Sequence, residues 1–441
     1  MALAMVLTSV SAIAAVRGDV NNDGEVTISD INMVIDFILS DSADLAGDVD
    51  GDGEININDI NTVIDIILRG GEEPDGPVVG GDISMLTKYE AHQRMALGYG
   101  VTSAYYRDIN NQRINDVITW VKQQGWNAAR VRLFVNPENA SNTDRGQGVI
   151  QNLDTVKVLG RRIKAAGMKF MLDFHYSDSW ADPVKQYTPA EWANLDDEAL
   201  TQKVYEYTRD CLRELKAAGA TPDYIQTGNE ISYGMLWGSV DSLAVLKKCY
   251  MGSDDNWDRF TNLLKAAGRA CREECPNAKI ILHTERVAKV NILLNFYNQM
   301  RNKQVDYDII GLSYYPYFHG DLATLANALN SVFNAYQDKD IMIVETGYSY
   351  HYSIGDLDYS STWPLTYEGQ RKFTSDLIEK LKPYARVKGL FWWFPEANEY
   401  GLAGNYWSVL HVTDNWYNAG LWDHATGKAL PALYELKHFV E

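Results

Sequence analysis

The sequence predicts an α/β protein in which a small helical module precedes a closed (β/α)8 barrel. Three observations favour this fold class. After about residue 77, eight short β-rich segments alternate with amphipathic helical segments, which is the pattern of βα units. Before them, DINMVIDFIL at 30–39 returns as DINTVIDIIL at 59–68, so the first part of the chain contains an internal repeat. Residues 1–75 also carry −14 of the net charge of −19, which sets this part apart chemically.

The composition of the chain excludes several functional classes. The 441 residues are 46% hydrophobic and 22% charged, a globular balance that excludes disorder as the main state. With 40 Lys and Arg against 59 Asp and Glu, nothing favours a nucleic acid or an anionic membrane as partner. The cysteines form no CxxC motif, so we interpret them as buried thiols rather than zinc or redox groups. They are Cys211, Cys249, Cys271 and Cys275.

The first segment, residues 1–16, is an almost uninterrupted apolar run. Ala12 and Ala14 near its end have the small-residue spacing of a signal-peptide cleavage site. The run is too short to span a bilayer, which takes ~20 residues. Because the usual basic start is missing, a buried N-terminal segment is the alternative. A signal peptide is the favoured interpretation, and it predicts export.

Two acidic loops follow, at 19–30 and 48–59. Each carries oxygen-bearing side chains at alternating positions and a glycine at its sixth position. Calcium binds six to eight oxygens around such a sharply turned loop. One loop alone could be an Asx-rich turn, but two copies at a fixed spacing favour calcium. The candidate ligands are Asp19, Asn21, Asp23, Glu25 and Asp30 in the first loop, and Asp48, Asp50, Asp52, Glu54 and Asp59 in the second.

Each loop runs into an apolar helix, and no amphipathic helix precedes either loop. This double loop–helix pattern over 18–69 resembles a type I dockerin. The resemblance implies two bound Ca²⁺ ions and a cohesin protein as partner. Dockerins usually carry polar contact pairs where this chain has Ile28-Ser29 and Ile57-Asn58. About fifty residues without a disulfide make a small core, so we expect bound metal to contribute much of the folding energy.

A Gly-, Pro- and acid-rich stretch without periodicity separates the module from the rest of the chain. Such a composition is typical of a flexible linker. We therefore expect a signal peptide at 1–16, the dockerin-like module at 17–69, a linker at 70–79 and the barrel domain at 80–441.

The eight β-rich segments predict a TIM barrel with long loops. A doubly wound sheet is the alternative, but it needs a glycine-rich phosphate turn after its first strand. Residues 79–84 hold two adjacent glycines and no GxGxxG entry to a helix. We expect helices, for example, at 156–166 and 197–217. The expected strands are 78–84, 128–135, 168–175, 223–228, 279–284, 308–315, 340–346 and 387–394.

The ends of these segments concentrate chemically active side chains, and barrel active sites form at strand C-terminal ends. No serine sits in a nucleophile elbow, and HExxH and a histidine cluster are absent. Hydrolysis by two carboxylates is what remains. The residues at the ends are Asp82, Arg130, Arg132, Asp173, His175, Asn229, Glu230, His283, Tyr314, Tyr315, Glu345, Trp392 and Trp393.

Glu230, in YIQTGNEI, and Glu345, in IMIVETGY, are the candidate pair. A glycosidase needs one protonated carboxyl and one ionised carboxylate, with pKa values set apart by their surroundings. Arg132 and a tyrosine hydroxyl near Glu345 would favour its charged form, which suits a nucleophile. Glu230, next to Asn229, is then the acid/base. A separation of ~5 Å predicts retention of anomeric configuration.

Each of these residues has a purely structural alternative. A glutamate at a strand end is often a helix cap or an ion-pair partner. Arg130 and Arg132 could neutralise inward carboxylates, and His175 and His283 could be core histidines. The tryptophans, Trp237 included, could be packing, although aromatic faces at a barrel mouth also suit sugar rings. Their joint placement favours a site.

Six segments of the barrel region resemble glycoside hydrolase family 53, the endo-β-1,4-galactanases. The similarity covers about residues 80–433. The strand-eight segment, WWFPEAN, differs from the family's YWEP-like run, which indicates a difference at the floor of the sugar subsites. The matching segments are RVRLFVNP (130–137), DFHYSDSWADP (173–183), TGNEI with MLW (227–231, 235–237), GLSYYP (311–316), VETGY (344–348) and GKALP (427–431).

The resemblance implies roles for single residues. Glu230 would be the acid/base and Glu345 the nucleophile. Arg132, His175, Asn229 and Tyr315 would support them, and Asp173, His283 and Tyr314 are further candidates for the substrate site. The residues implied to line galactose subsites are Asp178, Trp180, Asp182, Trp237 and Trp393.

Together these features predict a bacterial, secreted or cell-surface galactanase that cleaves β-1,4-galactan, the type I arabinogalactan of pectin side chains, without a catalytic cofactor. Three alternatives remain open: another β-glycanase of the same barrel clan, a catalytically silent carbohydrate-binding barrel tethered by its dockerin, and a component that serves chiefly in assembly.

Overall fold

The computed structural model describes residues 18–40, 42, 44–50, 53–68, 76–239, 246–250, 256–402, 412 and 416–441. The chain divides into two compact units, Met1–Gly76 and Pro77–Glu441, each described here by itself. The expected signal peptide, most of the expected linker and the candidate ligand Asp52 lie outside the described residues.

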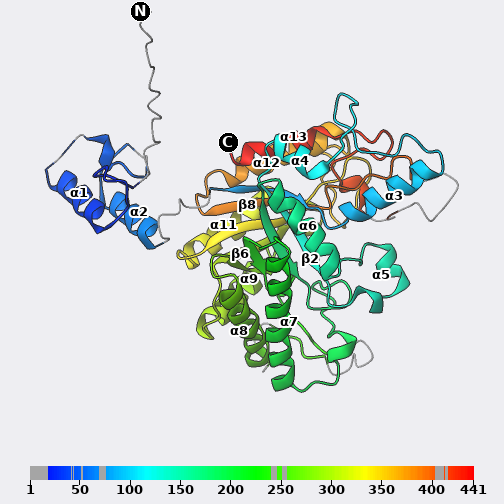
Figure 1. The fold of residues 1–441 in the computed structure, drawn as a ribbon, viewed down its shortest axis with the longest axis horizontal. Coiled ribbons are helices and arrows are strands. Elements are labelled where there is room, and N and C mark those ends of the chain that lie inside the picture. Colours follow the sequence, from blue (N-terminus) through cyan, green and yellow to red (C-terminus); the bar gives the residue numbers. More distant parts are fainter. Residues whose placement is uncertain are drawn as a thin grey trace, which may run out of the picture. The chain divides into compact units, whose positions relative to one another are not determined.

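The N-terminal unit consists of two matching halves (Figure 1). Its helices are α1 (Ile28–Leu39) and α2 (Ile57–Leu68), with a 3-10 turn, η1 (Leu45–Gly47), between them. Thr27 caps α1 by accepting the Ser29 N–H at 3.2 Å, which satisfies one of the free donors of the first turn. The apolar face of each helix turns inward as its periodicity predicts. The buried core is Val20, Val34, Val49, Val63 and Ile66.

The second unit is a closed barrel of eight parallel strands, each paired with the next, and β8 pairs with β1. This confirms the TIM-barrel prediction and excludes the doubly wound sheet. Two strands have the predicted bounds, and the others are one to three residues shorter. The strands are β1 (Val78–Asp82), β2 (Ala128–Leu133), β3 (Lys169–Phe174), β4 (Tyr224–Gln226), β5 (Lys279–Thr284), β6 (Ile309–Tyr314), β7 (Asp340–Thr346) and β8 (Val387–Trp393).

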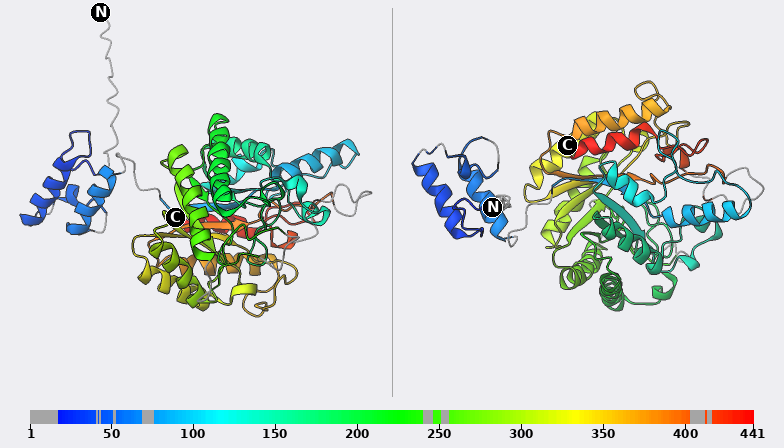
Figure 2. Two further views of the ribbon diagram at one scale, coloured as in Figure 1. Left: turned by 90° about the horizontal axis from the view of Figure 1, so that it is seen from below. Right: turned by 45° about the horizontal axis from the view of Figure 1, so that its top comes forward.

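Helices cover the outside of the barrel (Figure 2). The predicted helix at 197–217 has the same bounds as α7, and the one predicted at 156–166 begins three residues earlier because Asn152 caps it. The longer helices are α3 (Leu86–Gly98), α4 (Val117–Gln123), α6 (Leu153–Ala165), α7 (Asp197–Ala217), α8 (Asn256–Glu274), α9 (Val290–Asn302), α11 (Leu322–Ala335) and α12 (Tyr367–Leu381). The short ones are η2 (Pro137–Asn139), α5 (Asn142–Gly146), η3 (Ala190–Trp192), α10 (Pro316–His319), η5 (Tyr417–Ala419), α13 (Pro431–Glu435) and η6 (Leu436–Phe439).

The barrel interior is filled by side chains from every strand, so it is a packed core rather than a pore. Gly80 shows how closely β1 and β2 approach there, because a Cβ at this position would lie 1.9 Å from the Ala128 carbonyl oxygen. All four cysteines are buried, as predicted, and no disulfide joins any of them. No helix among the described residues is long and apolar enough to span a membrane. The interior cluster is Val78, Ala128, Met171, Tyr224, Ile281, Ile309, Met342, Val344 and Phe391.

Candidate active site

A cavity of about 680 Å³ opens at the C-terminal ends of the strands. Residues that follow seven of the strands line it, so the barrel brings together side chains that are far apart in the sequence. Both candidate glutamates are among them. The sequence-predicted residues that line the cavity are Arg132, His175, Trp180, Asp182, Asn229, Glu230, Tyr315, Glu345 and Trp393.

Glu230 stands in a tight turn after β4. Its φ of 48° is in the left-handed region, which is unusual for a residue with a side chain. Its carboxylate Oε1 accepts a hydrogen bond from the Ser313 hydroxyl at 2.7 Å, and Ser313 Oγ is also 2.8 Å from His283 Nε2. Burial raises the pKa of Glu230 well above its usual value, and the charges of Glu345 and Glu285 raise it further. This carboxyl therefore holds its proton.

Glu345 stands at the end of β7 and is 6% exposed. Its Oε1 pairs with Arg130 Nη2 at 2.9 Å, and its Oε2 accepts a hydrogen bond from the Tyr315 hydroxyl at 3.0 Å. Burial raises the pKa of Glu345 to about 7, against the opposing effects of Arg130 and Tyr315. Because Glu230 has only the Ser313 hydrogen bond to counter its burial, Glu345 is the stronger acid of the two.

The arginine beside Glu345 corrects one expectation. Arg130 makes this ion pair, whereas Arg132 pairs with Asp82 Oδ1 at 3.1 Å. The Arg132 guanidinium also lies over the Trp180 ring, 4.7 Å from its centroid. Arg132 thus holds an aromatic wall of the cavity and is not the partner of Glu345.

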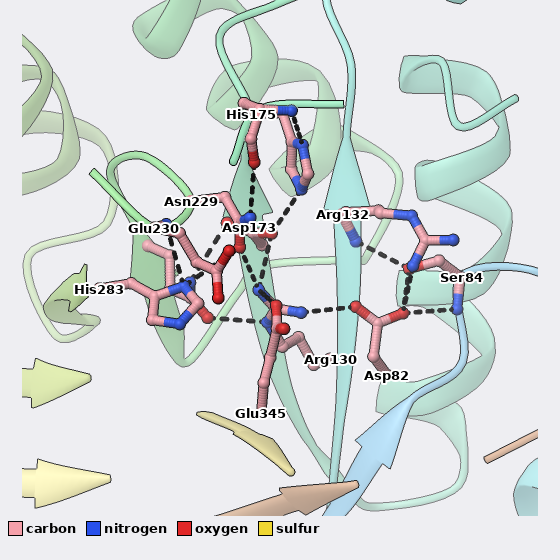
Figure 3. Close-up of polar contacts among 12 residues, drawn as sticks. Asp82, Ser84, Arg130, Arg132, Asp173, His175, Asn229, Glu230, His283 and Glu345 are labelled. Atoms are coloured by element: carbon pink, nitrogen blue, oxygen red, sulfur yellow. Dashed lines mark hydrogen bonds and ion pairs between the residues drawn. The ribbon is translucent and has the colours of Figure 1, made fainter. Parts of the chain in front are cut away.

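Arg130 is the centre of a fully buried polar network, shown in Figure 3. Its guanidinium nitrogens lie 2.8 Å from Asp82 Oδ2 and 2.8 Å from Asp173 Oδ2. It also donates to Asn229 Oδ1 at 2.9 Å and to Gln226 Oε1 at 2.8 Å. The alternative interpretation, an arginine that neutralises inward carboxylates, is therefore correct for this residue.

Burial and nearby charges determine which side chains of this network carry a proton. Burial opposes ionisation of Asp173, but Arg130 and then His175 lower its pKa to about 2. His175 Nε2 lies 3.0 Å from Asp173, and its Nδ1 accepts the Ala181 N–H at 3.2 Å, so the proton sits on Nε2. Burial and then Arg130 lower the pKa of His283 well below its usual value, so this ring is neutral.

Five predicted substrate residues do not line the cavity, and their roles in substrate binding stay predictions. Three of the five are Trp237, Asp178 and Tyr314. Trp237 is 1% exposed and donates its indole N–H to the Tyr233 carbonyl at 2.8 Å. Asp178 accepts N–H groups from the loop around Asn136, and the Tyr314 hydroxyl donates to a backbone carbonyl at 2.9 Å. All three stabilise loops around the site. Asp173 and His283 lie in the buried network beneath the cavity.

Several residues that line the cavity were not predicted. Glu285 directly follows β5, so a search of the C-terminal ends of the strands, where barrel active sites form, could have found it. Trp416 lies well beyond the end of β8, so its position gives no such signal. The lining residues that sequence analysis missed include Glu285, Arg286, Lys289, Phe318, His319 and Trp416.

The N-terminal unit holds a separate candidate metal site. Carboxylate oxygens of Asp48, Asp50 and Asp59 lie within 4.8 Å of one another. The sequence 18–68 contains no Lys, Arg or His to neutralise them. Asp59 is buried and also accepts the Val49 N–H at 2.7 Å, which ties the loop to its last ligand. An all-oxygen cluster of this kind fits Ca²⁺.

The first loop has the same construction. Asp30 accepts the Val20 N–H at 2.8 Å, as Asp59 does in the second loop. Asp19 accepts N–H groups of Asp23 and Gly24, and Asn21 donates to Asp23. The two remaining candidates, Glu25 and Glu54, are exposed.

Comparison with known families matches both units. The model for "Glycosyl hydrolase family 53" matches residues 78–436. The model for "Dockerin type I domain" matches residues 17–68, and calcium binding is general in that family. These ranges agree with the two resemblances found in the sequence.

Individual proteins and structures agree with the family match. The chain is 32% identical over 329 residues to "Endo-beta-1,4-galactanase" of Bacillus subtilis, covering 72% of this chain and 70% of that protein. It is 33% identical over 375 residues to an uncharacterised protein of Niallia circulans, covering 82% and 94%.

Among solved structures, a family 53 catalytic domain from Ignisphaera aggregans has a TM-score of 0.68 and 30% identity, covering 84% of this chain and 98% of that one. A fungal β-1,4-galactanase has a TM-score of 0.65 and 26% identity, covering 82% and 99%.

Proposed function

The chain belongs to glycosyl hydrolase family 53, and on this premise we propose that it is a retaining endo-β-1,4-galactanase that acts on the galactan side chains of pectin. The relatives named for this activity support the substrate class. One observation carries the proposal: Glu230 and Glu345 line one cavity, and their neighbours favour a proton on the first and a charge on the second.

The proposed reaction is a double displacement. The carboxylate of Glu345 attacks the anomeric carbon while the carboxyl of Glu230 gives its proton to the leaving glycosidic oxygen. A covalent bond from the sugar to Glu345 forms as the glycosidic bond breaks. Glu230, now ionised, then takes a proton from water, whose oxygen attacks the same carbon and releases Glu345. Two inversions restore the original configuration.

The surrounding residues have supporting roles in this proposal. Arg130 and the Tyr315 hydroxyl hold Glu345 in place and favour its charged form. His283 and Ser313 orient the carboxyl of Glu230. Trp180 and Trp393, whose ring centroids are 6.4 Å apart, offer apolar faces to sugar rings. Arg132, His175, Asp182 and Asn229 complete the polar lining.

Hydrolysis of linear β-1,4-galactan, with mannan and mixed-linkage glucan as controls, tests the substrate. We expect short galacto-oligosaccharides from galactan alone. Activity on a control polymer instead would keep the mechanism but replace the substrate with that of another β-glycanase. Inactivity on all three would favour the carbohydrate-binding barrel.

Azide rescue tests the roles of the two glutamates on an activated aryl β-galactobioside. With Glu230→Ala we expect a loss of ~10²–10⁴-fold on galactan, and azide yields a β-glycosyl azide from the covalent intermediate. With Glu345→Ala the loss is larger, and azide yields the α-glycosyl azide. Exchange of the two products would reverse the assignment, and the same anomer from both variants would contradict a retaining mechanism.

We further propose that the dockerin module at 17–69 binds two Ca²⁺ ions, one per loop, and docks onto a cohesin protein. The repeated loop geometry supports two sites, and the family match supports the partner class. Calcium titration by calorimetry should give two ions per chain. Cohesin capture should occur in Ca²⁺ and be lost in a chelator, and capture that persists in the chelator would contradict the proposal.

Export follows from the same proposal, because dockerin-bearing glycoside hydrolases act outside the cell. We propose cleavage of residues 1–16 as a signal peptide, a linker at 70–79 and a barrel domain at 80–441. N-terminal sequencing of the secreted protein should find a start near residue 17. An intact Met1 in the medium would contradict the cleavage.

A further inference from the structure

Glu285 is a third buried carboxyl group in the cavity, and the proposed reaction does not use it. It follows β5 directly, is 5% exposed and lines the same space as Glu230 and Glu345. Its Oε1 accepts the Ser232 hydroxyl at 2.6 Å and pairs with Arg286 Nε at 2.5 Å. Its Oε2 is buried without a hydrogen-bond partner among the described residues. A half-satisfied buried carboxyl is costly, so its presence calls for a function.

The position of Glu285 connects it to the turn that carries Glu230. Three successive residues of that turn are bonded to the end of β5. The Glu230 N–H lies 3.4 Å from His283 Nδ1, and the Ile231 N–H donates to the His283 carbonyl at 2.9 Å. The Ser232 hydroxyl bond to Glu285 is the third link. A left-handed φ at Glu230 persists only where the surroundings hold it, and these links do so.

The charges around Glu285 determine its electrostatic effect. Arg286, adjacent in sequence, and the Ser232 hydroxyl favour its ionised form, while burial and Asp182 oppose it and raise its pKa to about 7. Lys289 and His319 also line the cavity, and burial lowers the pKa of His319 to about 4, so this ring is neutral.

An ionised Glu285 acts on Glu230 together with two other carboxylates. Burial has the largest effect on the pKa of Glu230, and Glu345, Glu285 and Asp182 then raise it in that order. A second negative charge nearby disfavours loss of the proton from a carboxyl group. Glu285 differs from Glu345 in that it takes no part in the proposed covalent step.

We propose that Glu285 is a positioning residue that anchors the turn of Glu230 through the Ser232 hydroxyl and places a negative charge in the cavity that Glu230 lines. This inference rests on the proposed function, because it matters for a reaction in which Glu230 is the acid. Its two halves, the anchor and the charge, are separable by substitution.

Glu285→Gln tests the charge, because glutamine keeps the length of the side chain and an acceptor for Ser232. We expect the basic limb of the kcat/KM profile on linear β-1,4-galactan to move down by about one pH unit, with the acid limb unchanged. Glu285→Asp, which keeps the charge, should restore the basic limb. The matched control is Glu396→Gln, a buried carboxyl that does not line the cavity, and neither limb should move.

Ser232→Ala tests the anchor, because it removes the hydroxyl link and keeps the Glu285 carboxyl group. We expect kcat to fall with KM and the acid limb unchanged. An unchanged kcat would overturn the anchoring role. This variant also keeps the inference testable if Glu285→Gln does not fold, which its melting temperature would show.

A titration of the Glu230 carboxyl by ¹³C NMR separates this inference from the proposed function, because it needs no substrate. The Glu230 resonance is identified by its absence in Glu230→Gln. A midpoint about one pH unit lower in Glu285→Gln supports the inference even if the wild type does not hydrolyse galactan. A midpoint that stays the same would overturn the charge half, whatever the substrate proves to be.

Discussion

The two units of this protein both gather carboxylates, but they neutralise them in different ways. In the barrel, one guanidinium group, that of Arg130, lies within 2.9 Å of Asp82, Asp173 and Glu345. In the module, three carboxylates lie within 4.8 Å of one another in a sequence, 18–68, without a single cationic side chain. The barrel has an internal counter-ion, whereas the proposed Ca²⁺ would be an external counter-ion for the module.

The size of each unit explains this difference. The barrel has a large core around its network, so the desolvation cost of a buried ion pair is a small part of its folding free energy. Among the described residues of the module, five form the buried hydrophobic core, and about fifty residues leave little margin for unpaired charge. A bound cation there would both neutralise the acids and supply folding energy. The carboxylates of the barrel are therefore neutralised by the chain itself, whereas those of the module would be neutralised only when a cation is bound.

The largest expected effect comes from removal of the internal counter-ion. Arg130→Met leaves Asp173 and Glu345 without this cation, and it leaves Asp82 with Arg132 alone. We expect loss of most galactan hydrolysis and a decrease of ~3–5 kcal/mol in the free energy of unfolding, measured by kinetics and urea denaturation. Arg132→Met, which removes one ion pair with Asp82 and the contact with the Trp180 ring, is the comparison and should cost less stability. Equal losses in both variants would contradict the central role of Arg130.

Removal of the external cation should have the next largest effect, and only on the module. A chelator should abolish the calorimetric transition of the module and leave that of the barrel in place. The expected stabilisation by calcium is ~4 kcal/mol at a thousandfold excess over Kd. Asp59→Ala should mimic the chelator in part, and Asp36→Ala, an exposed acid on α1, should not. If the chelator also shifts the calorimetric transition of the barrel, the two units do not differ in their dependence on a cation.

A buried carboxyl that makes no ion pair with the described residues sharpens the comparison. Glu396 is fully buried, accepts the Met85 N–H at 2.7 Å and has one oxygen without a partner among the described residues. Burial and then Asp82 raise its pKa to about 8. The folded protein therefore binds a proton that the unfolded chain releases between pH ~4.5 and ~8.

The consequence is a loss of stability as pH rises through this window, complete above about pH 8. Glu396→Gln removes this titration, so its stability relative to wild type should rise from pH 4 to pH 9. We expect a change on the order of a few kcal/mol, measured by urea denaturation at each pH. A constant difference between the two proteins would show that Glu396 ionises freely.

The smallest expected effect comes from Tyr315, a neutral side chain that hydrogen-bonds Glu345. The Tyr315 hydroxyl lowers the pKa of Glu345, so Tyr315→Phe should raise it from about 7. The acid limb of the kcat/KM profile should move up by less than about one pH unit, with the basic limb unchanged. Tyr348→Phe, whose hydroxyl donates to the Trp363 carbonyl, is the control. An unmoved acid limb would mean that Arg130 alone sets the charge of Glu345.

Local sequence patterns were sufficient to predict much of the fold and of the candidate sites. The alternation of β-rich and helical segments predicted the closed barrel, and β5 and β7 have the predicted bounds. The loop repeat predicted two equivalent acidic sites, and the Asp30 and Asp59 carboxylates accept equivalent backbone N–H groups. The rule of strand ends placed Glu230 and Glu345 on one cavity. Their catalytic roles stay predictions.

The sequence pattern was insufficient where either of two similar residues could have made the same contact. Arg130 and Arg132 stand two apart on β2, and both side chains are buried. The sequence around the two arginines does not show that Arg130 pairs with Glu345 or that Arg132 lies over Trp180. Trp237 similarly looks like a sugar platform in sequence but is packed away from the cavity.

The sequence by itself determined the order of strands and helices, the two calcium-type loops and the candidate carboxylates, because periodicity and spacing are local properties of a chain. Only the tertiary structure decided which groups interact: that Arg130 contacts three carboxylates, that Glu285 is bonded to the turn of Glu230 through Ser232, and that one buried oxygen of Glu396 has no hydrogen-bond partner among the described residues. Distance and burial control these interactions, and both arise only when strands far apart in sequence close into a barrel.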